Sequence, residues 1–108
     1  MEREKLLSEG QWVLLRMLDG DYEAIHQKMR EDQRTQVTVD DIRAKVLEQF
    51  EDAGVYKQIE DRMTTGQTIQ GEQYGVAVLY CEFSEEDVLV RLFFDAQMEL
   101  VGFTLQQT

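Results

Sequence analysis

The spacing of apolar residues changes near Gly54, and this change limits the chain to one class of fold. Before Gly54, apolar residues recur every three or four positions, which predicts amphipathic helices. After Gly54, apolar residues come in short runs separated by polar turns, which predicts strands. Helices followed by strands are typical of the α+β class. The 108 residues suit a single domain, and we expect residues 1–108 to form one.

Three helices are expected in the first half. Gly20 ends the first helix, and Asp21 is suited to cap the second. A polar linker, residues 31–36, then leads to the third helix. Thr38 is a good N-cap for that helix because Asp41 follows three residues later and can complete a capping box.

Four strands are expected in the second half, over residues 56–69, 74–83, 88–94 and 98–105. The connections between them are short, which favours an antiparallel meander. The predicted fold is therefore three N-terminal helices packed on a four-stranded antiparallel sheet.

The predicted strands are apolar on both faces, whereas a sheet with one wet face should alternate apolar and polar residues. Helices can cover one face, and something else must cover the other. We expect a second subunit there, giving a homodimer; the alternative is a strongly curled sheet that closes on its own side chains. The candidate residues for the dimer face are Leu79, Phe83, Leu89, Phe93 and Phe103.

The charge of the chain argues against several classes of partner. The formal net charge is -11, which disfavours nucleic acid and anionic membrane surfaces. No apolar run approaches the roughly 20 residues that span a bilayer. The N-terminus does not read as a signal peptide, so a cytoplasmic location is the default expectation. A secreted or lipid-anchored location would follow if a leader has been removed.

Several segments together resemble a known family. They are Gly20-Asp21-Tyr22-Glu23, Val39 to Phe50, Val78 to Phe83, Val90 to Asp95 and Leu100 to Phe103. In these segments the chain resembles the domain of unknown function 3887 family, within the cystatin-like or nuclear transport factor 2-like α+β rolls. The resemblance implies helices packed into the concave face of a curved meander, and such rolls often dimerise through their sheets. It also implies no assigned activity, and a secretion or lipoprotein leader in many members.

The resemblance further suggests a pocket between helices and sheet, since some related rolls use a buried carboxylate and a tyrosine for proton transfer. The candidate pocket residues are Tyr22, His26, Tyr74, Tyr80, Glu82 and Arg91. Three of them also have a structural interpretation. His26 fits an ordinary helix position. Arg91 is expected to pair with an acid such as Glu82 or to line a sheet interface, although it could instead bind an anionic ligand, and Glu82 is expected to be a partner for Arg91 or a solvated strand end.

No catalytic or metal-binding motif stands out. Cys81 is the only cysteine, which excludes an internal disulfide, and its apolar strand favours an inert buried thiol. The acidic segment 85–87 lacks the ligand spacing of a calcium loop and is interpreted as a solvated turn. We therefore expect no metal and no other cofactor.

Two functional hypotheses follow. The first is a non-catalytic binding or interaction module that dimerises through the sheet. The alternative is a small-molecule-binding pocket protein or a roll-type isomerase or hydrolase. A cavity of about 300 Å³ or more with convergent polar groups would favour the alternative. A core filled by Trp12, Phe50 and Phe94 would favour the interaction module.

Overall fold

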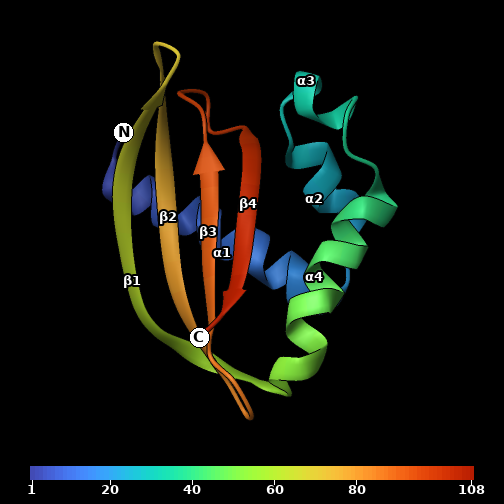
Figure 1. The fold of residues 1–108 in the computed structure, drawn as a ribbon. Helices are drawn as coiled ribbons and strands as arrows, with labels where there is room; N and C mark the ends of the chain where they lie inside the picture. The colour runs from blue at the N-terminus through green and yellow to red at the C-terminus, as the bar shows by residue number, and fades with distance from the viewer.

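The computed structural model describes residues 1–108 as a helical layer on one face of a four-stranded sheet (Figure 1). The elements are α1 (Arg3–Asp19), α2 (Tyr22–Lys28), α3 (Glu31–Arg34), α4 (Val39–Ala53), β1 (Tyr56–Ile69), β2 (Glu72–Phe83), β3 (Val88–Phe94) and β4 (Leu100–Gln107). The strands lie in the order β1-β2-β3-β4, with every neighbouring pair antiparallel. The predicted α+β class and the meander are thus confirmed. The single turn α3 is an addition, within the segment expected to be a linker.

The two faces of the sheet differ in what covers them. In Figure 1, α1 runs behind the strands, α4 lies beside β4, and no helix crosses the front. We call the helix-covered side the inner face and the other side the outer face. None of the helices is both long and apolar enough to cross a bilayer.

Two small residues bring α1 close to the inner face. Gly10 is buried on α1 opposite Ala77 of β2, and a Cβ atom at Gly10 would lie only 2.7 Å from the Ala77 Cβ. Real carbon atoms do not approach this closely, so the helix position depends on the missing side chain. The larger apolar residues of α1 can then pack on either side of this contact.

The start of α4 follows the sequence signal. The Asp41 backbone N–H donates to the Thr38 hydroxyl at 3.0 Å, and the Thr38 N–H donates to the Asp41 carboxylate at 2.9 Å. This reciprocal capping box satisfies two N–H groups that have no partner within the helix. The predicted N-terminus of this helix is therefore confirmed.

A cluster of 21 buried residues fills the space between the helices and the inner face. Phe94 is fully buried in it, and the ring of Phe50 lies 5.0 Å from that of Phe83. Trp12 packs against the margin of the same cluster. The hollows that remain between the helices and the sheet lie at its margins and are open to solvent, one of about 460 Å³ beside Phe50 and Phe83 and one of about 440 Å³ between Ile42 and Phe103.

Irregular pairing divides the apolar residues of β1 between the two faces. The β1–β2 register shifts between Tyr56 and Gln58 and again between Ile59 and Asp61. Tyr56 and Ile59 pack on the core, whereas Met63 lies opposite Val78 on the outer face. Extra residues of this type change which face the next side chains occupy.

The contact between α1 and β2 predicts an unusual response to alanine. Gly10→Ala should raise helix propensity by about 1 kcal/mol. It should nevertheless lower the free energy of unfolding by about 1–3 kcal/mol, because the new methyl group collides with Ala77. Urea denaturation would measure this loss.

Gly102→Ala is the matched control, since no atom lies within 4 Å of a Cβ built at Gly102. We expect that variant to change stability by no more than about 0.5 kcal/mol. A stabilised Gly10→Ala protein would contradict the close approach.

Candidate functional site

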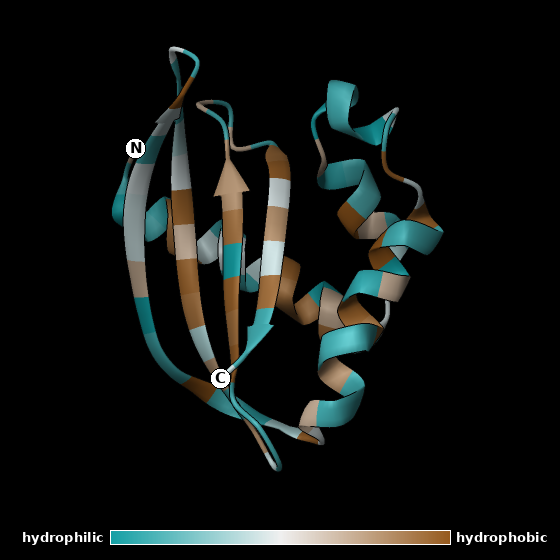
Figure 2. Ribbon diagram, in the orientation of Figure 1, coloured by the Kyte–Doolittle hydropathy of each residue, from teal (hydrophilic) through white to brown (hydrophobic).

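The outer face carries its own small apolar cluster. Val76, Val78 and Leu89 are buried there, and Phe93 packs against them. Figure 2 shows the matching pattern: β2 and β3 are mostly hydrophobic along their length. Side chains of the sheet surround this cluster, and the helical layer reaches this face only at its margin, where Gln33 of α3 borders a hollow with Tyr74 and Phe93. The prediction that the sheet is apolar on both sides is therefore correct.

Exposed apolar side chains border this cluster on the β1 side. Met63 and Ile69 of β1 are each 45% exposed, and Tyr80 of β2 is 38% exposed. In the β1–β2 ladder Met63 pairs with Val78, Ile69 with Glu72 and Tyr80 with Asp61. This register places all three apolar side chains on the outer face. Three of the six large exposed apolar residues of the chain thus lie on this face, spread along β1 and β2. Apolar exposure on a face that no helix covers marks a surface suited to contact with another molecule.

Arg91 is the only basic residue in β3, and it lies on this outer face. Its neighbours across the ladders are Val78 and Thr104. None of the six ion pairs in the structure includes it. A lone cation amid apolar neighbours is thus available to a partner or to solvent.

The predicted pair between Arg91 and Glu82 is wrong. Glu82 accepts a hydrogen bond of 2.9 Å from the side chain of Gln58 instead. The two residues share the outer face, but Arg91 lies opposite Val78. Glu82 is four residues further along β2, or about 13 Å, which is too far for an ion pair.

The dimer-face candidates divide between the two faces. Leu79, Phe83 and Phe103 belong to the helix-covered core, so they are not available to a second subunit, which corrects the sequence-based assignment. Leu89 and Phe93 lie on the outer face. Alternation alone identified two sets of residues without showing which set meets the helices.

Two of the pocket candidates belong to the helical layer. His26 Nε2 lies 2.7 Å from the Val37 carbonyl oxygen and 3.2 Å from that of Arg34, so this nitrogen donates to the backbone between α3 and α4. The Tyr22 ring lies 5.5 Å from the Arg43 guanidinium. Both side chains therefore have structural contacts.

The other four pocket candidates, Tyr74, Tyr80, Glu82 and Arg91, lie on β2 and β3 with their side chains on the outer face. His26 and Tyr22 instead make their contacts within the helical layer. Each hollow at the surface includes at most one of the six candidates. The six residues thus do not converge on a common pocket.

Cys81 is buried on the inner face, among the core residues. Burial, with a smaller contribution from the charge of Asp87, raises the pKa of its thiol to about 12. The group is therefore protonated at neutral pH and unsuited to nucleophilic attack. No set of three or more carboxylate, histidine or cysteine side chains is placed to hold a metal ion.

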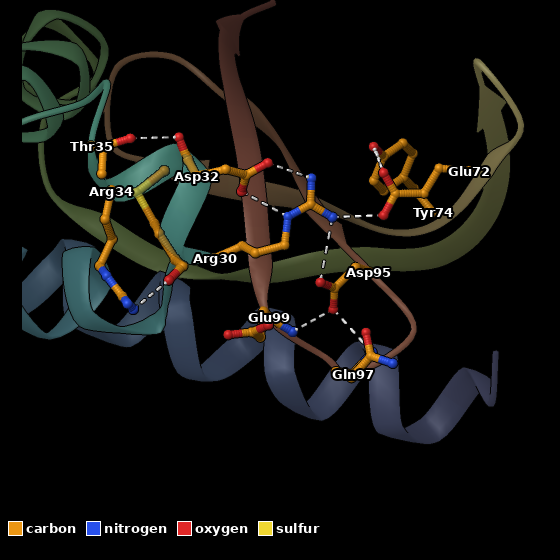
Figure 3. A network of polar contacts seen from close by, with 10 residues as sticks. Arg30, Asp32, Arg34, Thr35, Glu72, Tyr74, Asp95, Gln97 and Glu99 are labelled. Atoms are coloured by element: carbon orange, nitrogen blue, oxygen red, sulfur yellow. Dashed lines mark hydrogen bonds and ion pairs between the residues drawn. The ribbon is translucent and has the colours of Figure 1, made fainter.

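A polar cluster around Arg30 was not foreseen from the sequence (Figure 3). The guanidinium donates twice to the Asp32 carboxylate, at 2.8 and 3.0 Å, and once to Glu72 at 2.6 Å. The same Nη1 atom lies 3.5 Å from Asp95. Arg30 thereby links the segment before α3 to the β1–β2 hairpin and to the turn after β3. Because two of these partners lie far away in the chain, no local spacing could have indicated the cluster.

The acidic partners of Arg30 are themselves well satisfied. Asp95 is buried and accepts hydrogen bonds from the backbone N–H groups of Gln97 and Glu99, at 3.0 and 2.9 Å. The Tyr74 hydroxyl donates to Glu72 at 2.5 Å. These bonds make the cluster a structural clamp, which joins the helical linker, the hairpin and the turn after β3.

The clamp shifts the ionisation of its members. The Arg30 hydrogen bonds lower the pKa of Asp32, and the Tyr74 hydroxyl, followed by Arg30, lowers the pKa of Glu72. The hydrogen bond to Glu72 raises the pKa of Tyr74. The neighbouring acids, Asp32 foremost, raise the already high pKa of Arg30. All four shifts favour the protonation states that hold the cluster together at neutral pH.

Comparison with known proteins gave two matches. A family model described as "Protein of unknown function (DUF3887)" matches residues 13–103. The chain is also similar to a solved structure, "NMR structure of protein from Ruminococcus gnavus ATCC 29149", with a TM-score of 0.83 and 22% sequence identity. That likeness covers 96% of this chain and 90% of the other, and it shows the fold alone. No curated protein matches the chain.

The clamp predicts a pH-dependent stability. A lowered carboxyl pKa stabilises the fold above the ordinary values, 3.8 for Asp32 and 4.5 for Glu72, and this contribution is lost as the pH falls through the folded-state values. Arg30→Met should therefore lower the urea midpoint more at pH 7 than at pH 3. Arg34→Met is the control, since Arg34 donates only to the carbonyl oxygens of Gln27 and Met29. If Arg30→Met lowers the urea midpoint by the same amount at pH 7 and at pH 3, the clamp is contradicted.

Because Arg91 has no acidic partner, its charge should contribute little to folding. We expect Arg91→Met to change the free energy of unfolding by no more than about 0.5 kcal/mol at neutral pH. Denaturant titration of the variant beside the wild type would measure the difference. A loss well above that size would indicate that Arg91 has a stabilising partner within the chain.

Proposed function

The chain belongs to the DUF3887 family of proteins of unknown function, and we propose that it is a non-catalytic interaction module that forms a homodimer through the uncovered side of its sheet. The observation that carries this proposal is the exposure of three apolar side chains, Met63, Ile69 and Tyr80, on β1 and β2. These residues lie on the face that no helix covers. A second copy would remove them from water, and apolar burial is the main source of association free energy.

The groups most suited to catalysis are occupied or unreactive, which supports a non-catalytic role. The only histidine, His26, is held by two backbone carbonyl groups in the helical layer. The only cysteine, Cys81, is buried with a raised thiol pKa. A general base or nucleophile needs an accessible group in a suitable ionisation state.

The packing between helices and sheet favours the interaction module over the pocket protein. Phe50 and Phe94 belong to the packed core, Trp12 packs against it, and the hollows left between helices and sheet are open to solvent. The six candidate pocket residues are divided between the two sides of the sheet. A ligand site instead gathers a few convergent polar groups in one concave place.

Charge placed within the exposed apolar group should weaken the dimer. We expect Met63→Glu to reduce self-association by about tenfold or more, because a carboxylate would have to be buried in the contact. Sedimentation equilibrium across a concentration series would measure the dissociation constant. Circular dichroism would verify that the variant is folded, as expected for a residue 45% exposed.

Leu15→Glu is the matched control, since Leu15 is 51% exposed but lies on α1, on the opposite side of the sheet. That variant should dimerise like the wild type. A wild-type chain that remains monomeric up to about 1 mM would refute the proposal, because any dimer would then be weaker than useful affinities.

A further inference from the structure

The two edges of the sheet are treated differently by the rest of the chain. At β4, the Arg30 backbone N–H donates to the Leu100 carbonyl at 2.8 Å. Further along, the Lys45 ammonium donates to the Phe103 carbonyl, and the Gln107 N–H donates to the Gln49 side chain at 3.2 Å. The helical layer thus occupies polar groups along the β4 edge from its first residue to its last. Covering of this kind prevents an edge from pairing with another chain.

The β1 edge has no such cover. None of the backbone hydrogen bonds outside the helices and the strand ladders involves residues 56–69. Most of the strand is exposed as well. Its outward N–H and C=O groups therefore remain available to another strand.

Only the first half of β1 carries features that discourage pairing. Both register shifts lie before Asp61, and all four charged residues of the strand lie within 57–62. Residues 63–69, Met-Thr-Thr-Gly-Gln-Thr-Ile, contain no charge and no proline, and their pairing with β2 is regular to the end of the strand. Charges, bulges and proline are the usual protections of an edge strand, so this segment is unprotected.

The uncharged segment is complementary to itself. Met63 and Ile69 lie three residues on either side of Gly66, on the same face, and each is 45% exposed. An antiparallel pairing of two copies centred on Gly66 places Met63 opposite the partner's Ile69. Directly opposite residues in such a pair point to one face with Cβ atoms about 5 Å apart. The pair of Met63 with Ile69 would therefore occur twice, once in each half of the contact.

We propose that two copies join by antiparallel pairing of residues 63–69 of β1, with a two-fold axis at Gly66, to form one continuous sheet. This inference rests on the proposed dimer, but it places the contact at the β1 edge of the sheet and not across the outer face. The occupant of the edge is a second copy because the same seven residues supply both halves of an isologous contact. No charge faces a like charge within the paired segment, although each copy carries a net charge of -11.

The inferred contact gives a distinctive salt dependence. Two strongly acidic copies repel each other, while the paired segment contains no ion pair that salt could weaken. Raising the ionic strength shortens the distance over which charges act and should therefore strengthen the dimer. A contact formed through Arg91 and acidic residues of a second copy would respond in the opposite direction.

Gly66→Lys is the decisive variant. A Cβ atom at Gly66 would have the Tyr74 carbonyl oxygen as its nearest neighbour, at 3.9 Å, so the monomer has room for a side chain. In the dimer, the two lysines would face each other across the axis, and like charges directly opposite destabilise a strand pair. We expect dimerisation to weaken about tenfold or more in sedimentation equilibrium.

Two controls isolate the edge. Gly66→Thr adds an uncharged side chain at the same position and should retain the dimer. Thr104→Lys places the same charge on the outer face at β4, opposite Arg91, and should also leave a contact at the β1 edge intact. Hydrogen–deuterium exchange on the wild type provides a second readout, since amides within 63–69 should exchange more slowly in the dimer than in the monomer.

The outcomes separate this inference from the proposed function. A dimer that survives Gly66→Lys overturns the edge contact but leaves a dimer formed through the sheet. A wild-type chain that is monomeric up to about 1 mM refutes both. If Gly66→Lys and Thr104→Lys both weaken the dimer, hydrogen exchange of the wild type decides. Slower exchange of the amides within 63–69 in the dimer than in the monomer supports the edge contact, and equal exchange overturns it.

Discussion

The close contact of α1 with the middle of the sheet determines much of this architecture. At Gly10 the helix backbone approaches Ala77 so closely that no side chain fits between them. With α1 in this position, one face of the sheet is sealed by 21 buried residues. The helices therefore pack on that face of the sheet. The strands on the other side must then protect their apolar residues with one another, which explains why Val76, Val78 and Leu89 are buried without a helix above them.

A second constraint acts on the connections. Arg30 holds three acidic side chains from three parts of the chain, in a protein with twice as many acidic as basic residues. One cation thereby offsets repulsion among groups that would otherwise push the hairpin, the turn and the helical linker apart. Asp95 also accepts hydrogen bonds from two backbone N–H groups of the turn after β3, so the same cluster positions that turn. This end of the sheet is thus held by electrostatic contacts as well as by apolar packing.

Residues close together in the sequence predicted the helix cap, the strands and their order correctly. Contacts between residues far apart in the sequence could not be predicted. The capping box at Thr38, the strand segments and the antiparallel order all follow from spacing between near neighbours. The faces of β1 could not be assigned, since two register shifts alter the alternation without any mark in the residues. The assignment of Phe103 to the dimer face was wrong for a related reason: the ladder also shifts between Phe93 and Phe94. The Arg30 cluster depends on partners that only folding brings together.

The covered edge of β4 limits how large an assembly of this chain can become. A sheet with two open edges can recruit strands at both ends, which is the route to fibres. Here the helical layer closes one end by bonding to Leu100, Phe103 and Gln107. Growth by main-chain pairing must therefore stop once the single remaining edge is used. The chain can therefore keep one edge strand that is able to pair with another copy and still not form fibres.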